Sequence, residues 1–387
     1  MNILKLFIDS YWTSPTDQLL YIFNKSNNEL KSDEEIVKIV EEWLKQKNYS
    51  ASDCFARTLE HYQRQHQHRH KNRYRYAALL AFLYRWGIGT RIDPQKTFYW
   101  YTLAAEKLRD PLAQNELGWC YSEGFGTKQD HKAAFKWFFR SAEAGNAIAA
   151  MNLGQCYFYG EGTSIDDAKA LHWYEISARK NYLNGQIQLA QFYRCASKPY
   201  RSTRLAKHWY EKAANSGSPE AQVELGFCYY HAIGVSKQLK EHAIEWYKKA
   251  AKQDYPRAQA LLAKYYLHTE PSLSFKYYLR AANNGYPHAK KRLADFYAQG
   301  IGTKVNHVRA FYWYRQCAVN NKEDHERAAL RLVRYFDKGY GTQVDLHEAI
   351  KWFRVFQESG EMSFDDVKWC NQFRLKLQYG KHIPIVG

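Results

Sequence analysis

The sequence predicts an all-α protein, a right-handed α-solenoid of about eight helix-turn-helix repeats with helical extensions at both ends. Three observations favour this fold class. A large aromatic residue recurs about every 36 residues, a leucine lies about 20 residues before it, and a Gly, Asn or Asp usually lies about eight residues after it. Such a period is typical of helical-repeat proteins, whose units bury their apolar faces by stacking on one another.

The aromatic residue marks the second helix of each unit. It recurs as Trp100, Trp137, Trp173, Trp209, Trp246, Tyr277, Trp313 and Trp352. In the second unit, Ala134, Trp137 and Phe138 fall on one helical face because they are spaced i, i+3 and i+4. Asp130 just before them is placed to accept backbone N–H bonds as an N-cap. The later Gly, Asn or Asp tolerates a left-handed conformation and predicts the end of the helix.

The leucine marks the first helix, and a Gly or Ala follows it in most units. The leucines are Leu80, Leu117, Leu153, Leu189, Leu225, Leu262, Leu293 and Leu332. The small residue lets the partner helix approach closely, and a tyrosine one turn later fills the remaining space. The alternation of very small and very large residues is therefore interpreted as packing complementarity between two helices.

A Gly-x-Gly-Thr motif joins the two helices in five units. It begins at Gly87, Gly124, Gly160, Gly300 and Gly339. A glycine-rich phosphate loop needs a strand before it, whereas both flanks of this motif are predicted to be helical. We therefore interpret the motif as a turn rather than as a phosphate-binding site.

The complete pattern reads A-x-x-x-L-G-x-x-Y-x-x-G-x-G-T…A-x-x-W-Y-x-x-A-A-x-x-G, and it resembles the Sel1-like repeat, a relative of the tetratricopeptide repeat. The resemblance covers roughly residues 75–360 and departs from the pattern in two units, where "RCASKPYRS" and "LHTEPSLS" replace the glycine turn. It implies an α-solenoid of stacked helix pairs, and no cofactor is predicted. It also implies an adaptor role in signalling or protein degradation, because proteins with Sel1-like repeats commonly act in this way.

The chain is expected to divide into three parts. Residues 1–74 form a helical N-terminal extension, residues 75–360 form the repeat solenoid, and residues 361–387 form a C-terminal capping helix and tail. In the first part, Ser32 and Glu35 have the spacing of a capping box at the start of a helix.

Residues 61–75, "HYQRQHQHRHKNRYR", are rich in His and Arg and contain no acidic residue. Three interpretations stay open: a solvated linker before the first repeat, a contact with nucleic acid or another polyanion through phosphate neutralisation, and metal binding by His66, His68 and His70. Alternating histidines point to different sides of a helix, which weakens the metal interpretation. No metal site is therefore predicted.

The chain has 56 Lys and Arg residues against 39 Asp and Glu, a net charge of +17, which suits a nucleic acid, an anionic lipid or an acidic protein as partner. The first residues lack the apolar core of a signal peptide, and no stretch is apolar enough to span a membrane. The seven cysteines are therefore expected to be reduced thiols in the cytoplasm. Cys120, Cys156 and Cys228 share one packing position in their repeats.

The candidate binding residues lie two and five positions after the leucines. By analogy with related repeats, the first helices line the inner groove of the solenoid. These positions mix aromatic, amide and charged side chains, as recognition surfaces do, although drift at exposed positions would also produce such variation. The candidates are Phe82, Trp119, Gln155, Phe158, Gln191, Arg194, Phe227, Tyr230, Lys264, Asp295 and Arg334.

No local spacing of Ser, Cys, His or acidic residues assembles a catalytic group, so no catalytic residue is predicted. The sequence favours a non-catalytic, cytoplasmic scaffold or adaptor that binds a peptide or protein partner in its groove. The alternative is a helical-repeat protein that binds nucleic acid or another polyanion through its basic surface. An enzyme is the weakest interpretation.

Overall fold

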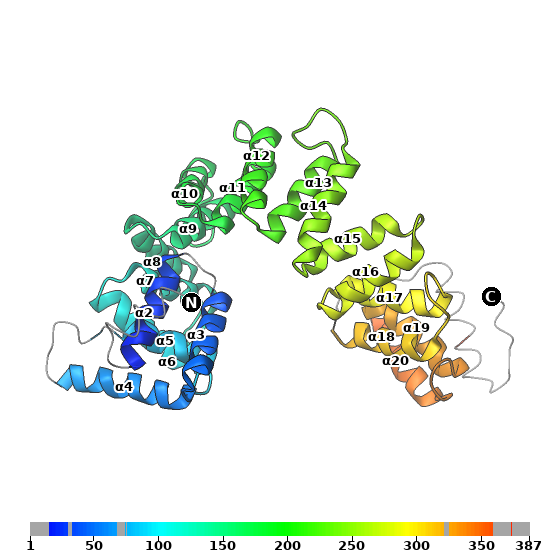
Figure 1. The fold of residues 1–387 in the computed structure, drawn as a ribbon, viewed down its shortest axis with the longest axis horizontal. Coiled ribbons are helices and arrows are strands. Elements are labelled where there is room, and N and C mark those ends of the chain that lie inside the picture. Colours follow the sequence, from blue (N-terminus) through cyan, green and yellow to red (C-terminus); the bar gives the residue numbers. More distant parts are fainter. Residues whose placement is uncertain are drawn as a thin grey trace. The chain divides into compact units, whose positions relative to one another are not determined.

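The computed structural model describes residues 15–29, 33–67, 74, 76–320, 325–358 and 373. These residues form nineteen helices and no strand (Figure 1). Three helices precede the repeats: α2 (Pro15–Asn28), α3 (Asp33–Lys47) and α4 (Ala51–Gln67). The predicted all-α fold is thereby confirmed.

Each of the eight repeats is a pair of helices, here called helix A and helix B. The pairs are α5 (Ala77–Trp86) with α6 (Pro94–Lys107), α7 (Pro111–Glu123) with α8 (His131–Glu143), α9 (Ala147–Tyr159) with α10 (Asp167–Arg179), α11 (Leu183–Cys195) with α12 (Thr203–Asn215), α13 (Pro219–Tyr230) with α14 (Lys240–Lys252), α15 (Pro256–Tyr266) with α16 (Pro271–Asn283), α17 (Pro287–Gln299) with α18 (His307–Asn320), and α19 (His325–Lys338) with α20 (Leu346–Glu358).

The chain folds as two compact units. Unit 1 consists of Met1–Ala221 and His231–Gln238, and unit 2 consists of Gln222–Tyr230 and Leu239–Gly387. From α5 to α12 in unit 1, and from α14 to α20 in unit 2, every helix packs against the next helix in the chain. This stacking of neighbours is the packing that defines an α-solenoid.

The helix ends have the caps that the sequence predicts. Asp130 accepts the backbone N–H of Ala133 at 3.0 Å and so caps the start of α8. After helix B the chain turns through residues with positive φ, such as Gly145 (91°), Asn181 (60°) and Asp254 (57°). These left-handed residues end the helix where the Gly, Asn and Asp pattern placed the end.

The leucines lie at the centre of the core, and each is at most 1 % exposed. The small residue that follows brings helix B close. A Cβ added to Gly118 would lie 2.7 Å from the ring of Phe138, and one added to Gly154 would lie 2.7 Å from the ring of Tyr174. Both rings belong to the residue directly after the repeat tryptophan, so that residue, rather than the tryptophan, fills the space beside the glycine.

The Gly-x-Gly-Thr motif is a turn that also touches the preceding repeat. Gly124 and Gly126 have φ of 69° and 73°. A Cβ on Gly126 would lie 1.9 Å from the carbonyl oxygen of Pro94, the first residue of the preceding helix B. The same contact joins Gly162 to His131, Gly302 to Pro271 and Gly341 to His307. The second glycine is therefore required by close packing between repeats, and the turn interpretation is confirmed.

Helix α4 packs against the first repeat in the same way as the helix B of one repeat packs against the next repeat. A Cβ on Gly89 would lie 2.1 Å from the carbonyl oxygen of Ala51, the first residue of α4. The rings of Phe55 and Tyr84 meet edge-on at 5.0 Å, as those of Phe98 and Tyr121 do at 5.3 Å between the first and second repeats. The N-terminal extension thus continues the stack of unit 1 by one helix.

The extension and the first repeats share one core. Buried residues of α2, α3 and α4 belong to the same cluster as those of α5, α6 and α7. At the other end, Phe373 is buried and its ring lies 5.2 Å from that of Phe353 on α20. The other residues of the predicted C-terminal cap, 361–372 and 374–387, lie outside the described residues. The domain limits at residues 74 and 360 stay a prediction.

Candidate protein-interaction surface

All eleven candidate residues lie on A helices, from α5 in unit 1 to α19 in unit 2. The leucines on the same helices are buried, whereas every candidate except Phe82 is partly or fully exposed. Positions five and one before the leucine share a side of the helix with positions two and five after it, because they are spaced i, i+4, i+7 and i+10. This side is called the helix A face below, and it is described separately for each unit.

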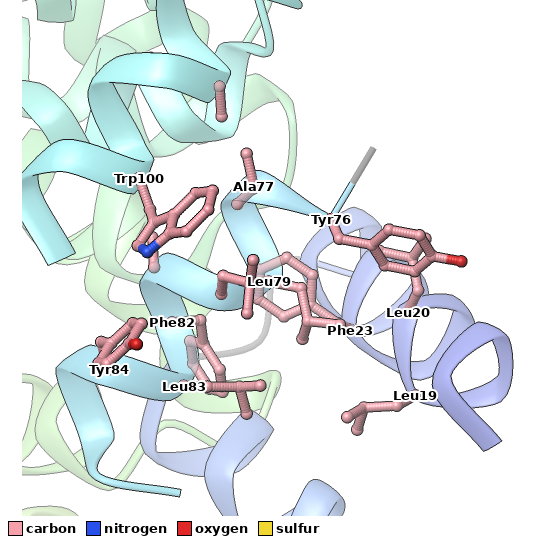
Figure 2. Packing of buried hydrophobic residues seen from close by; sticks show 14 of the residues in the cluster. Leu19, Leu20, Phe23, Tyr76, Ala77, Leu79, Phe82, Leu83, Tyr84 and Trp100 are labelled. Carbon is pink, nitrogen blue, oxygen red and sulfur yellow. The ribbon is translucent and has the colours of Figure 1, made fainter. Parts of the chain in front are cut away.

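Phe82 is not available to a partner, and its prediction as a groove residue is wrong. It is 1 % exposed, and its ring centroid lies 5.1 Å from that of Phe23 on α2. Figure 2 shows this packing between the N-terminal extension and the first repeat. The extension and the residue before α5 are also joined by a hydrogen bond, in which the hydroxyl of Tyr76 donates to the carboxylate of Asp17 at 2.7 Å. The extension covers the helix A face of the first repeat, and the exposed part of that face in unit 1 begins at the second repeat.

Trp119 is half-buried and is held under an arginine from the preceding repeat. The guanidinium carbon of Arg85 lies 3.9 Å from the ring centroid of Trp119. Arg85 also forms an ion pair with Glu116, whose side chain is largely buried. A cation over an aromatic face contributes about 0.5–2 kcal/mol, depending on how well it is desolvated. The ion pair and the ring contact fix Trp119 at the start of the exposed face.

A polar network continues from this ion pair along unit 1. The amide of Asn115 donates to Glu116 at 2.8 Å, and the amide of Asn152 on α9 donates to Asn115 at 2.9 Å. Three consecutive A helices, α5, α7 and α9, are therefore joined by side-chain hydrogen bonds. Buried polar groups that satisfy one another in this way hold a single arrangement of their helices.

The next part of the helix A face of unit 1 presents unpaired amides. Gln155 and Gln191 occupy the same position on the contacting helices α9 and α11, and Gln188 lies one turn before Gln191. None of the three side chains forms a hydrogen bond with another described residue. A side-chain amide carries a donor and an acceptor side by side, as a peptide group does. Phe158, beside Phe192 at 5.6 Å, supplies the apolar part of this surface.

Arg194 lies on the same helix as Gln191, one turn later, and is partly exposed. Its guanidinium carbon is 6.0 Å from the ring centroid of Tyr210. In unit 2, Phe227 and Tyr230 are partly exposed on α13. The ammonium group of Lys240 lies 5.7 Å from the ring centroid of Tyr230.

The remaining candidates of unit 2 are charged. Lys264 is exposed on α15, and Arg334 is partly exposed on α19. Asp295 on α17 forms an ion pair with Lys291 at 3.1 Å and accepts the hydroxyl of Tyr314 at 2.6 Å. Burial of the hydroxyl, together with the carboxylate of Asp295, raises the pKa of Tyr314 above its ordinary value. Asp295 therefore helps to hold α17 against α18.

Two further positions of the helix A face were missed by the sequence analysis. They lie one and five residues before the leucine, and in unit 2 they hold Arg292, Arg327 and Arg331. The helical period could have identified them. Counting back three residues from the position two after the leucine gives the first of these positions, and counting back four more gives the second. In the same set, Arg257 on α15 forms an ion pair with Glu224 on α13 at 2.5 Å.

Six of the seven cysteines are described, and none of these six is in a disulfide. Burial raises the pKa of both Cys120 and Cys156 to about 12, so these thiols stay protonated and unreactive at neutral pH. No group of three or more His, Cys, Asp and Glu residues in the described part of the chain is arranged to hold a metal ion. The side chain of His66, and all of His68 and His70, lie outside the described residues, so the interpretations of residues 61–75 stay predictions.

None of the helices in the described part of the chain is both long and apolar enough to cross a bilayer.

The repeats match a known family. Eight segments match the family model described as Sel1 repeat: residues 74–107, 111–146, 147–182, 184–218, 219–255, 256–286, 287–318 and 327–354. No curated protein matches the chain.

Several solved structures are similar to this chain. A Sel1 repeat protein from Oxalobacter formigenes is 25% identical, with a TM-score of 0.61 over 81% of this chain and 90% of that one. A protective antigen present in uropathogenic Escherichia coli strains, displaying an SLR fold, is 19% identical, with a TM-score of 0.46 over 100% of this chain and 99% of that one. An immunity protein from Pseudomonas aeruginosa is 21% identical, with a TM-score of 0.39 over 54% and 80%.

Proposed function

The chain belongs to the Sel1 repeat family, and from that premise we propose that it is a non-catalytic, cytoplasmic scaffold that binds a protein or peptide partner on its helix A faces. Sel1 repeat proteins generally act as protein-interaction scaffolds. The likeness to the Oxalobacter formigenes protein extends over most of both chains and supports the same architecture here.

One observation supports the helix A face as the binding surface. Within each A helix the leucine and the residue after it are buried, and that next residue is Gly or Ala in every repeat except the last, which has Val333. Two residues after the leucine, the side chain changes from Trp119 to Gln155, Gln191 and Lys264 and is at least partly exposed. A position that packing leaves free, on a scaffold that packing holds rigid, is where binding residues are found in repeat proteins.

The side chains on this face support binding rather than catalysis. In unit 1 they are an aromatic residue under a guanidinium, several amides and a second aromatic residue. Aromatic and arginine side chains dominate the energetics of protein interfaces, and free amides satisfy the backbone of a partner. Among the described residues of this surface, none is arranged as a nucleophile beside a base.

The proposal is tested by affinity capture with the full chain followed by mass spectrometry. Replacing Gln155 and Gln191 with Ala and Phe158 with Ser removes part of the helix A face of unit 1. We expect the helical content to stay unchanged and the recovery of bound proteins to fall at least about tenfold, because a few central residues usually hold most of the binding energy of an interface.

The matched control changes three exposed residues of helix B in the same unit, with Lys132→Ala, Lys136→Ala and Phe139→Ser. It should leave the recovered proteins unchanged. The proposal fails if the wild-type chain captures no protein, or if both variants lose their partners to the same extent.

A further inference from the structure

The helix A face of unit 2 differs in chemistry from that of unit 1, and its charge identifies a class of partner. We propose that the A helices of the last three repeats, α15, α17 and α19, bind an acidic segment of a polypeptide. This inference rests on the proposed scaffold function and names the chemistry of one partner. The residues that carry it are Lys264, Arg292, Arg327, Arg331 and Arg334, called the basic face below.

Among the A helices, the positive charge is concentrated on these three. Together α15, α17 and α19 contain nine Lys and Arg residues against three acidic ones. The corresponding helices of unit 1, α7, α9 and α11, contain one Arg and two Glu. These two sets of A helices have the same place in the repeat but differ in their number of charged residues. The repeat fold itself therefore does not require the positive charge.

The cations of the basic face share one side of their helices. On α19, Arg327, Arg331 and Arg334 are spaced i, i+4 and i+7. Lys264 has on α15 the position that Arg334 has on α19, and Arg292 has on α17 the position of Arg331. The three helices contribute buried residues to one core cluster, which holds them together within unit 2.

The most exposed cations of the basic face have no acidic partner among the side chains that the structure describes. Lys264, Arg292 and Arg327 are exposed, and none of them forms an ion pair with a described residue. The acidic residue Asp295 is already paired with Lys291, and Asp337 is buried. Like charges one turn apart, such as Arg327 and Arg331, destabilise a helix. A bound carboxylate would remove this repulsion and can accept two hydrogen bonds from one guanidinium.

The surroundings of the cations favour a polypeptide over a nucleic acid. On α15, α17 and α19, the helix A face contains no Phe, Tyr or Trp, and instead Leu261, Leu267 and Ala298 lie among the cations. Binding of single-stranded nucleic acid uses aromatic side chains on which the bases stack.

The test uses the full chain and a fluorescein-labelled peptide of alternating Glu and Gly, with binding followed by fluorescence anisotropy. The variant Lys264→Glu, Arg292→Glu, Arg327→Glu should raise the Kd for this peptide at least about tenfold, and binding to the wild type should weaken between about 50 and about 200 mM salt. The control variant Lys276→Glu, Arg315→Glu, Arg354→Glu changes three exposed cations of helix B in unit 2 by the same net charge. It should change the Kd by less than about twofold.

Three results would overturn the inference: no binding of the acidic peptide to the wild type, equal weakening in the two variants, or tighter binding of an oligo-dT of matched charge than of the peptide. The last result would assign the basic face to nucleic acid.

Affinity capture separates this inference from the proposed function. If the wild type captures proteins and the basic-face variant keeps them all, only the inference fails, whereas a wild type that captures no protein contradicts the scaffold function itself.

Discussion

At the scale of single residues, the side chain directly after each repeat tryptophan lies deeper in the core than the tryptophan. Tyr174 is 1 % exposed and Phe138 is 5 % exposed, whereas Trp137 is only partly buried. The guanidinium carbon of Arg140 lies 4.6 Å from the ring centroid of Trp137, at the outer side of helix B. The sequence pattern located the helix correctly but singled out its more conspicuous aromatic residue rather than its more deeply buried one.

Replacing Phe138 with Ala should therefore destabilise the protein more than replacing Trp137 with Ala. We expect a loss of about 3–5 kcal/mol in the free energy of unfolding for Phe138→Ala, because a large buried ring is removed. For Trp137→Ala we expect roughly 1–2 kcal/mol, from a partly exposed ring and its cation contact. Urea denaturation followed by circular dichroism measures both, and an equal or larger effect of Trp137→Ala would contradict the assignment.

The cysteines provide a second test at this scale, because their burial controls their reactivity. The raised pKa of Cys120 and Cys156, about 12 in each case, leaves almost no thiolate near neutral pH, whereas Cys195 is exposed. Brief treatment of the folded protein with iodoacetamide should modify Cys195 and spare the other two. Peptide mass spectrometry reads this out, and modification of Cys120 as fast as Cys195 would show that its helix is open to solvent.

At the scale of secondary-structure elements, the glycine turn ties each repeat to the one before it. The second glycine of the turn lies against the first carbonyl of the preceding helix B, and Gly89 makes the same contact with α4. The N-terminal extension is thus packed into the array by the rule that joins the repeats to one another. This contact would be lost if α4 were a loosely attached helix.

Alanine substitutions test that contact. Gly126→Ala and Gly89→Ala should each lower stability by more than about 3 kcal/mol, because a Cβ at either position meets backbone atoms and the positive φ adds strain. Gly217→Ala is the matched control: its φ is also positive, but a Cβ there meets nothing within 4 Å, so only about 1–2 kcal/mol should be lost. Thermal unfolding compares them, and a Gly89→Ala effect no larger than that of Gly217→Ala would show that α4 is not an integral part of the stack.

The sequence was sufficient to predict the repeats because each helix is specified locally. Spacing of Leu, Tyr and Gly within about 36 residues determines the helix pair, its caps and its turn, and the structure agrees with all three. The role of α4 could not be predicted in the same way, because Arg57 stands six residues into the helix where the repeats have a tryptophan. The one repeat-like feature of α4 in the sequence was Phe55, which packs edge-on against Tyr84 as Phe98 packs against Tyr121.

The candidate site was predicted less completely, for a physical reason. Which residues of a helix face outward follows from its period, and ten of the eleven candidates are at least partly exposed. Which of those residues another element covers depends on contacts distant in sequence. Phe82 is covered by Phe23, and the amphipathic pattern of α2 does not say which surface that helix will bury.

At the scale of the whole molecule, the net charge of +17 is not spread evenly over the A helices. Those of the second to fourth repeats are nearly uncharged and present amides and aromatic residues, whereas those of the last three are strongly basic. The charge total alone pointed to nucleic acid, lipid and acidic protein without distinguishing among them. The cations lie on exposed helix A positions of the last three repeats, and this placement identifies the surface where an acidic partner is proposed to bind.

The central claim, that partners bind the helix A face, is tested most directly by site-specific photo-crosslinking. A benzoylphenylalanine placed at Gln155, on the helix A face of unit 1, is compared with one at Lys136, an exposed residue of helix B in the same unit. On irradiation in cell extract, the probe at position 155 should form discrete protein adducts and the probe at position 136 should form none. Discrete protein adducts from position 136 alone, or equal yields from both positions, would contradict the claim.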